Sequence, residues 1–299
     1  MAAPSFHGPT GSLIPAYRTH LRHFRDRRFV YPVVARRSHG VSVGINLSPD
    51  ARCDLDCVYC QVDRSAAAAA GDVDRGVLLR ELEETLDEVI SGSLFEDPGF
   101  DSVPADLRRL NDIAFSGDGE PTMHREFAAI VNDVAQLKVR RGLHAVKLVL
   151  ITNATLLHLP RVRQALVTLD AHQGEIWAKL DAGTPGYYHQ IDRSRVPFRR
   201  ILTNLLDSAR IRPIVIQSLF VAWRGEPPPE PELEAYCQRL REIRQGGGTI
   251  ARVQILTVAR PPAERDARPL TASALERIGR LVEARAGVPV EVFPGIEVG

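Results

Sequence analysis

The chain has 299 residues, 44% of them hydrophobic and 25% charged, a composition typical of a globular protein with one large domain or two smaller ones. Its 38 basic and 37 acidic residues nearly cancel, which excludes a global field attracting nucleic acid or a membrane surface. We expect a cytoplasmic protein, because no apolar run reaches the roughly 18 residues of a membrane span, the start lacks a secretory signal, and the 4 cysteines do not suggest extracellular disulfides.

Residues 1–40 show no clear hydrophobic periodicity, and we predict that they form a basic N-terminal extension ahead of a core domain at 41–299. The arginines of this segment are Arg18, Arg22, Arg25, Arg27, Arg28, Arg36 and Arg37. The pattern favours a solvated surface segment, and contact with the phosphates of an RNA is the alternative interpretation.

Runs rich in β-branched residues follow at regular intervals along the chain. They predict strands at 41–47, 111–117, 146–153, 175–181, 212–221 and 252–258, with a weaker one at 288–293.

Segments with helical periodicity lie between these predicted strands. Leu78, Leu82, Leu86 and Ile90 are predicted to share one helix face, and similar patterns occur at 127–134, 198–206 and 233–243. Pro160 fits the first turn of another helix, and Ser273 with Glu276 predicts a capping box for the last. Alternation of this kind indicates an α/β fold with a parallel sheet. Six or seven such units fit an incomplete (β/α)6-type TIM-like barrel, which we predict, or an open doubly wound sheet as the alternative. Ligands of such folds bind at the C-terminal ends of the strands.

Three cysteines follow the first predicted strand with the spacing CxxxCxxC: Cys53, Cys57 and Cys60. A [4Fe–4S] cluster is normally held by four thiolates, so three would leave one iron open for another ligand. A zinc site completed by a histidine and a thiol–disulfide pair formed by Cys57 and Cys60 are the alternatives. Cys237 lies on the apolar face of a predicted helix and is expected to be a buried structural thiol.

This motif, with Tyr59 before its last cysteine, resembles that of the radical S-adenosylmethionine (SAM) superfamily. The resemblance implies a [4Fe–4S] cluster on Cys53, Cys57 and Cys60, with the amino and carboxylate groups of SAM on the open iron and Tyr59 near the adenine. It further implies that an electron from a low-potential donor of the flavodoxin or ferredoxin type cleaves SAM into methionine and a 5′-deoxyadenosyl radical. That radical abstracts hydrogen from a substrate, and the cluster makes the enzyme oxygen-sensitive.

A glycine-rich turn follows the second predicted strand and comprises Gly117, Asp118, Gly119, Glu120 and Pro121. Glycines let a backbone approach a ligand closely, and a carboxylate can hold an ammonium group. The turn is similar to the GGEP element with which the superfamily binds the amino group of SAM. It departs from that element at Asp118, where a glycine is usual.

Polar residues also end the next predicted strands. The resemblance places Thr152 and Asn153 at the carboxylate or ribose of SAM, and Gln217 and Thr257 occupy comparable positions on later strands, where they could contact the cofactor.

Lys179 and Asp181 have the same parity on their strand, so both side chains should face the mouth of the barrel. They are our candidates for catalytic contacts to substrate or SAM, and a mutual ion pair is the alternative. Arg260 is a further candidate for binding an anion.

Within the superfamily, the segments VYCQ, SGDGEPT, ITNATLL, KLDAG and VARPP are most similar to wyosine-forming tRNA-modifying enzymes and their uncharacterised prokaryotic relatives. Those tRNA enzymes carry upstream cysteines for a second cluster, and no cysteine precedes Cys53 here. We therefore predict a single-cluster radical SAM enzyme with an unidentified small-molecule, RNA or protein substrate. A tRNA-base-modifying enzyme of the wyosine type and a non-catalytic zinc or thiol-redox protein are the alternatives.

Overall fold

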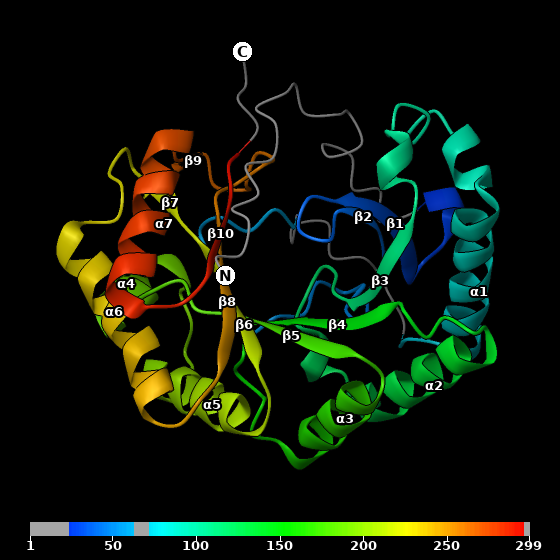
Figure 1. Cartoon of the computed structure of the whole chain (residues 1–299), viewed down its shortest axis with the longest axis horizontal. Helices are drawn as coiled ribbons and strands as arrows, with labels where there is room; N and C mark the ends of the chain where they lie inside the picture. Colours follow the sequence, from blue (N-terminus) through cyan, green and yellow to red (C-terminus); the bar gives the residue numbers. More distant parts are fainter. Residues whose placement is uncertain (1–23, 63–71, 296–299) are drawn as a thin grey trace, which may run out of the picture.

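A curled, mostly parallel sheet forms the centre of the computed structural model, which describes residues 24–62 and 72–295 (Figure 1). Its eight strands run in the order β1 (Val30–Ala35), β2 (Gly40–Ile45), β3 (Leu110–Phe115), β4 (Lys147–Thr152), β5 (Gly174–Lys179), β6 (Ile214–Leu219), β8 (Ile250–Leu256) and β10 (Val290–Phe293). Every neighbouring pair is parallel except β1 and β2. The sheet is a half-barrel, which confirms the predicted incomplete TIM-like barrel.

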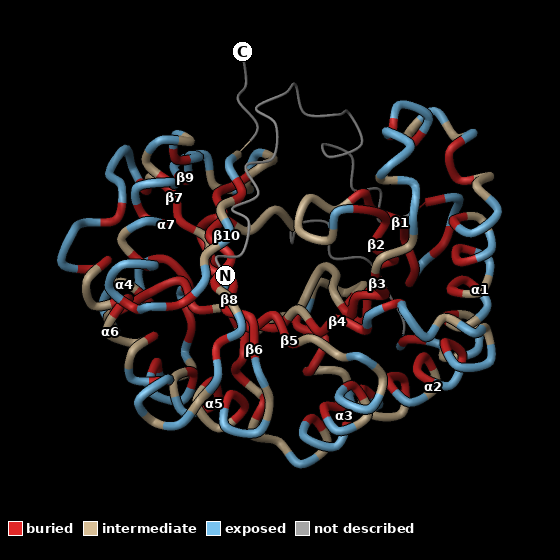
Figure 2. The backbone as a smooth tube through the Cα atoms, viewed as in Figure 1, coloured by how far each residue is buried: buried red, intermediate tan, exposed pale blue. Residues whose placement is uncertain are grey.

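Helices cover the outer surface of the curled sheet (Figure 1). They are α1 (Arg75–Ser91), α2 (Phe127–Arg140), α3 (Pro160–Ala171), α4 (Pro185–Ile191), α5 (Phe198–Ile211), α6 (Glu230–Gln245) and α7 (Ala272–Ala286). Buried residues gather where the helices face the strands, so the main core lies between these two layers (Figure 2). Across the described ranges, no helix has both the length and the apolar character needed to span a membrane.

Each predicted strand corresponds to an observed one, with one subdivision. The predicted strand 212–221 ends as β6, and the chain then forms the short β7 (Val221–Trp223), which pairs with β9 (Ala267–Pro269) in a separate sheet. Sequence analysis did not predict β9 or the short helix α4.

Two details of the helix predictions are wrong. Leu78, Leu82 and Leu86 are fully buried, but Ile90 is 54% exposed, because each four-residue step rotates the position by about 40° around the helix. The N-cap of α7 is Thr271, whose hydroxyl accepts from the Ala274 N–H at 3.2 Å, so the helix begins before the predicted capping box.

Strand β1 lies inside the segment 1–40, for which the sequence showed no periodicity. It pairs with β2 from Val30 opposite Ile45 to Ala35 opposite Gly40 and forms one edge of the sheet. Just before it, Arg27 donates two hydrogen bonds to the Glu88 carboxylate of α1, at 2.6 and 2.8 Å.

Arg25 donates to Glu88 as well, at 2.8 Å. Two arginines of the basic segment are therefore in internal ion pairs, while Arg18 and Arg22 lie outside the described residues.

Candidate functional site

A cavity of about 680 Å³ lies on the concave side of the sheet and extends to the C-terminal strand ends. Its size is within the range of small-molecule sites. The predicted site residues that line it are Cys53, Cys57, Tyr59, Cys60, Gly117, Asp118, Gly119, Glu120, Thr152, Asn153, Lys179, Asp181, Gln217 and Thr257. Pro121 is the exception, because it is buried at the start of a 3-10 turn directly behind Glu120. The structure thus brings together residues more than 200 positions apart, and their individual roles stay predictions.

The cysteine loop, residues 46–62, crosses the C-terminal end of the barrel and is held there by the segment after β8. The Ala263 N–H donates to the Cys60 carbonyl at 3.0 Å. Gln61 and Arg260 bond reciprocally: the Gln61 amide donates to the Arg260 carbonyl, and the Arg260 guanidinium donates to the Gln61 side-chain oxygen, both at 2.8 Å. Arg260, predicted as an anion binder, therefore has a contact that anchors the cysteine loop.

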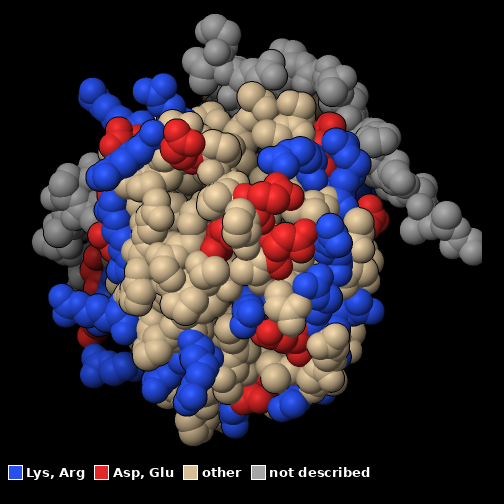
Figure 3. Space-filling view, turned by 90° about the vertical axis from the view of Figure 1, so that its left-hand side faces the viewer, with Lys and Arg blue, Asp and Glu red and all other residues tan. Residues whose placement is uncertain are grey.

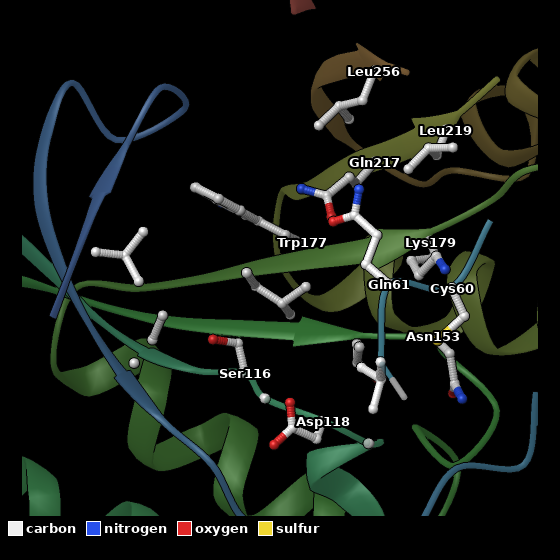
Figure 4. A pocket seen from close by; sticks show the side chains of 18 of the residues that line it. Cys60, Gln61, Ser116, Asp118, Asn153, Trp177, Lys179, Gln217, Leu219 and Leu256 are labelled. Carbon is white, nitrogen blue, oxygen red and sulfur yellow. The ribbon is translucent and has the colours of Figure 1, made fainter. Parts of the chain in front are cut away.

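All three cysteines of the motif are free thiols on the cavity wall, and Figure 4 labels Cys60, Lys179 and Asn153 among the residues that line it. Asn153 Nδ2 lies 3.6 Å from the sulfur of Cys53, and Lys179 Nζ lies 3.8 Å from the sulfur of Cys57. Burial raises the pKa of both these thiols, and the Lys179 cation opposes that rise.

Hydrogen-bond donors and a cation beside sulfur favour the thiolate form, which is the form that binds iron. The donor set therefore fits an iron–sulfur cluster in its chemistry. Across residues 24–62 and 72–295, no three His, Cys, Asp or Glu side chains converge on a point that could hold a single metal ion.

A charged cluster lies beneath the cysteine loop and is centred on Lys179. Its ammonium is 3.4 Å from the Asp181 carboxylate and 4.6 Å from the centre of the Tyr59 ring. The mutual ion pair between Lys179 and Asp181, the alternative to a catalytic role, is therefore present, and the catalytic role stays a prediction. Burial alone would lower the pKa of Lys179, but the neighbouring Cys57, Asp181 and Asp192 raise it above its ordinary value.

Asp192, at the C-terminal end of α4, belongs to this cluster and was missed by sequence analysis. It is 2% exposed, and its Oδ1 accepts from the Cys57 thiol at 3.4 Å and from the Tyr59 hydroxyl at 3.3 Å. Burial, helped by the nearby Asp181 charge, raises the pKa of Asp192 to about 8. Tyr59 also donates to Asp181. The Tyr59 hydroxyl therefore points into a pair of buried carboxyl groups.

The glycine-rich turn after β3 packs against the cysteine loop. A Cβ on Gly119 would lie 2.0 Å from the Arg52 carbonyl oxygen, and one on Gly117 would lie 2.2 Å from Asn46 Oδ1. Asn46 also donates to Asp118 Oδ2 at 2.7 Å. The glycines are therefore needed for close packing beside Cys53, and Asp118 bonds to the end of β2.

Glu120 joins the end of β3 to the end of β4. Its Oε1 accepts from the Thr152 hydroxyl at 2.7 Å and from both the N–H and hydroxyl of Thr122, and its Oε2 accepts from the Asn153 N–H at 2.7 Å. Burial raises the pKa of this carboxyl, and these donors oppose the rise. Each carboxylate oxygen carries two lone pairs, and among the described residues Oε2 accepts only from the Asn153 N–H, so Oε2 retains room for one more donor.

Gln217 and Thr257 face neighbouring side chains and backbone. Gln217 donates to the Gln254 side-chain oxygen at 3.0 Å, and the Thr257 hydroxyl accepts from the Leu270 N–H at 3.0 Å. Both residues line the cavity, where Figure 4 shows Gln217, and Thr257 also holds the segment that leads to α7.

Comparison of the structure with solved structures gives a match over most of the chain. The structure of TYW1 with a lysine–pyruvate adduct bound aligns with 83% of this chain and 74% of its own, at a TM-score of 0.53 and 12% identity. The chain has the fold of TYW1.

Sequence comparisons reach proteins named UPF0026 and one named GTPase Obg. The UPF0026 protein of Helicobacter pylori (strain ATCC 700392 / 26695) is 25% identical over 77% of this chain and 66% of its own length. The GTPase Obg of Brachyspira hyodysenteriae is 22% identical over 90% of this chain and 35% of its own. The chain thus spans between about a third and two thirds of the length of these relatives. No protein-family model matches it.

The name GTPase is that of the Brachyspira protein and describes that protein, not this chain. In this chain, each of the three lysines, Lys138, Lys147 and Lys179, follows an apolar residue, so the Gly-Lys pair of a phosphate-binding P-loop does not occur in the sequence.

Proposed function

We propose that this protein is a radical SAM enzyme that holds a [4Fe–4S] cluster on Cys53, Cys57 and Cys60 and cleaves SAM to a 5′-deoxyadenosyl radical. The observation that carries the proposal is the arrangement of three free thiols and the polar ends of five consecutive parallel strands around one cavity. The shared fold with TYW1, a wyosine-forming radical SAM protein, supports the same conclusion.

The proposed cluster would supply one electron to break a sulfur–carbon bond of SAM, leaving methionine and the radical. The residues of this chain would bind and orient SAM. Glu120 Oε2 has a lone pair left for the SAM ammonium group. Thr152 and Asn153, held by Glu120, would lie at the carboxylate or ribose, and Tyr59 near the adenine.

The charged side chains around Lys179 would keep the cysteine loop in place while the [4Fe–4S] cluster gains and loses an electron. The Lys179 cation lies beside the Cys57 sulfur, where a positive charge stabilises a thiolate that bears negative charge. Asp181, 3.4 Å from the ammonium, compensates that cation inside the protein, so its burial does not leave an unpaired charge.

An RNA substrate has less support from the described surface. Arg25 and Arg27 are engaged with Glu88, and basic and acidic side chains are interspersed on the face that includes α6 and α7 (Figure 3). A surface of mixed sign does not concentrate the positive potential that polyanions require. Modification of tRNA in the manner of the wyosine enzymes therefore stays the alternative.

Metal analysis of anaerobically prepared protein tests the proposed ligands. We expect iron and sulfide to be retained by the wild type and by C237A, whose thiol is buried on α6, and to be lost from C53A, C57A and C60A. Full iron retention by any of these three variants would contradict the ligand assignment. Zinc copurifying in place of iron would favour the structural-zinc alternative.

A further inference from the structure

The cavity continues from the cysteine loop toward the N-terminal ends of the parallel strands, where Arg37 follows β1. The guanidinium of the half-buried Arg37 lies 5.4 Å from the centre of the Trp177 ring. Trp177 precedes Lys179 by two residues on β5, a rise of about 7 Å along the strand. Figure 4 shows the Trp177 ring projecting into the cavity, away from Cys60.

Arg37 differs in its partners from other arginines that are buried or half-buried. Arg27 is paired with Glu88, and Arg252 is paired with Glu175 and Glu291. In the part of the chain that the structure describes, no carboxylate lies within ion-pair distance of Arg37.

The surroundings of Arg37 are unfavourable to its charge. Burial and the adjacent Arg36 cation together lower the pKa of Arg37 to about 10, although Asp112 and Tyr31 act to raise that pKa. Asp112 itself accepts a hydrogen bond from Ser42. Arg36, which also lines the cavity, donates to the Pro294 carbonyl.

A partly desolvated cation without an ion-pair partner is costly unless an anion binds it. The planar fork of a guanidinium matches a carboxylate or a phosphate with two parallel hydrogen bonds. We propose that Arg37 binds the carboxylate or phosphate of a small-molecule substrate whose remaining atoms lie along Trp177 toward the cysteine loop. This inference rests on the proposed function, since it names the substrate class of the same cavity.

The depth of Arg37 favours a small anion over a nucleic acid. An enzyme that acts on a flipped base takes the uncharged base into its pocket and leaves the phosphates of the strand at the entrance. Arg37 lines the cavity at the opposite end of the strands from the cysteine loop, where phosphates left at that entrance would not reach it.

Tryptophan fluorescence of the full chain tests this proposal. The protein has 2 tryptophans, so W223F leaves Trp177 as the single indole reporter. Inorganic phosphate and acetate are titrated separately at constant ionic strength, with chloride as the third titrant. We expect saturable binding of phosphate, acetate or both, weakened at least tenfold by R37Q and unchanged by R28Q, which removes an exposed charge from the same segment.

The tighter of the two anions identifies the substrate group. Equal binding by the R37Q and R28Q proteins would overturn the proposal, as would an equal response to chloride or no saturable response at all.

A melting experiment separates binding from structure. If Arg37 is a binding residue, R37Q should melt no lower than the wild type in anion-free buffer, since it removes an unpaired charge. A lower melting temperature with unchanged anion binding would show a structural role and overturn the proposal.

Should R37Q not fold, R37K keeps the positive charge but loses the planar guanidinium. Anion binding should then weaken several-fold, and unchanged binding would overturn the proposal. None of these measurements needs iron, SAM or a reductant, so their failure is distinct from failure of the proposed enzyme function.

Discussion

The Cys57 thiol donates to the Asp192 carboxylate at 3.4 Å, although the two residues are 135 positions apart in the sequence. The main chain repeats this connection, because the Asp56 N–H donates to the Asp192 carbonyl and the Val58 N–H to the Ile191 carbonyl, at 3.0 and 2.9 Å. The end of α4 thus fixes the middle of the cysteine loop through both side-chain and backbone contacts.

Replacing Asp192 should destabilise the protein before any cofactor is added. D192A leaves the buried Tyr59 hydroxyl and the Cys57 thiol with fewer acceptors, which should lower the free energy of unfolding by about 1–3 kcal/mol. D192N keeps an acceptor oxygen and should cost less. Urea denaturation of the metal-free protein measures both, with D207A on the exposed side of α5 as the control. Equal stability of the D192A and D207A proteins would refute the structural importance of this contact.

Close packing at Gly119 should make the cysteine loop intolerant of even one added methyl group. In G119A the new Cβ would clash with the Arg52 carbonyl, so we expect a loss of about 1–3 kcal/mol in unfolding free energy and reduced iron retention. G186A is the matched control, because nothing lies within 4 Å of its new Cβ at the start of α4. It should be neutral or slightly stabilising in thermal melts. A G119A protein that behaves like G186A would show that the loop can move aside.

Glu120 should be important for SAM affinity. E120Q replaces one acceptor oxygen by an NH₂ group that faces protein donors and removes the negative charge available to the SAM ammonium. Because a hydrogen bond to a charged group contributes about 1.5–3 kcal/mol, SAM should bind at least about tenfold more weakly. Calorimetry on cluster-loaded protein provides the measurement, and E126Q, a change at an exposed carboxylate, provides the control. Unchanged affinity in E120Q would remove Glu120 from the proposed SAM site.

The Glu175 carboxylate should make stability depend on acid pH. Burial raises the pKa of Glu175, but Lys147, Trp177 and Arg252 outweigh it and lower the pKa to about 2. The folded state therefore holds this proton less tightly than the unfolded chain. The contribution of the ionised Glu175 carboxylate to the free energy of unfolding, at most about 3 kcal/mol, is complete above about pH 4.5 and disappears as pH falls toward 2. The wild type should exceed E175Q in unfolding free energy at neutral pH and lose that advantage in acid. A constant difference between the two proteins would contradict the assigned pKa.

Most of the parallel sheet and the cysteine loop could be predicted from the sequence. Strands covered on their outer face by helices read as apolar runs, and their C-terminal ends mark one edge of the barrel, so local patterns also located most of the candidate site. The spacing of Cys53, Cys57 and Cys60 within one loop is itself a local signal.

The residues that were missed depend on contacts between distant segments. Asp192 follows a helix of 7 residues, too short to show a periodicity, and nothing near it in sequence indicates that it meets Cys57. Strand β1 contains Pro32, which weakens a strand prediction and is tolerated here because β1 lies at the edge of the sheet. The contact between the Arg37 guanidinium and the Trp177 ring likewise depends on the pairing of β1 with β2, so neither segment indicates it by itself.

The proposed function is tested most directly by asking whether the protein cleaves SAM. After anaerobic loading with iron and sulfide and chemical reduction, the wild type should convert SAM to methionine and 5′-deoxyadenosine, which chromatography detects. The C57A protein should form none, and C237A should match the wild type. Failure of the iron-loaded, reduced wild type to release 5′-deoxyadenosine, or equal release by C57A, would contradict the radical SAM account.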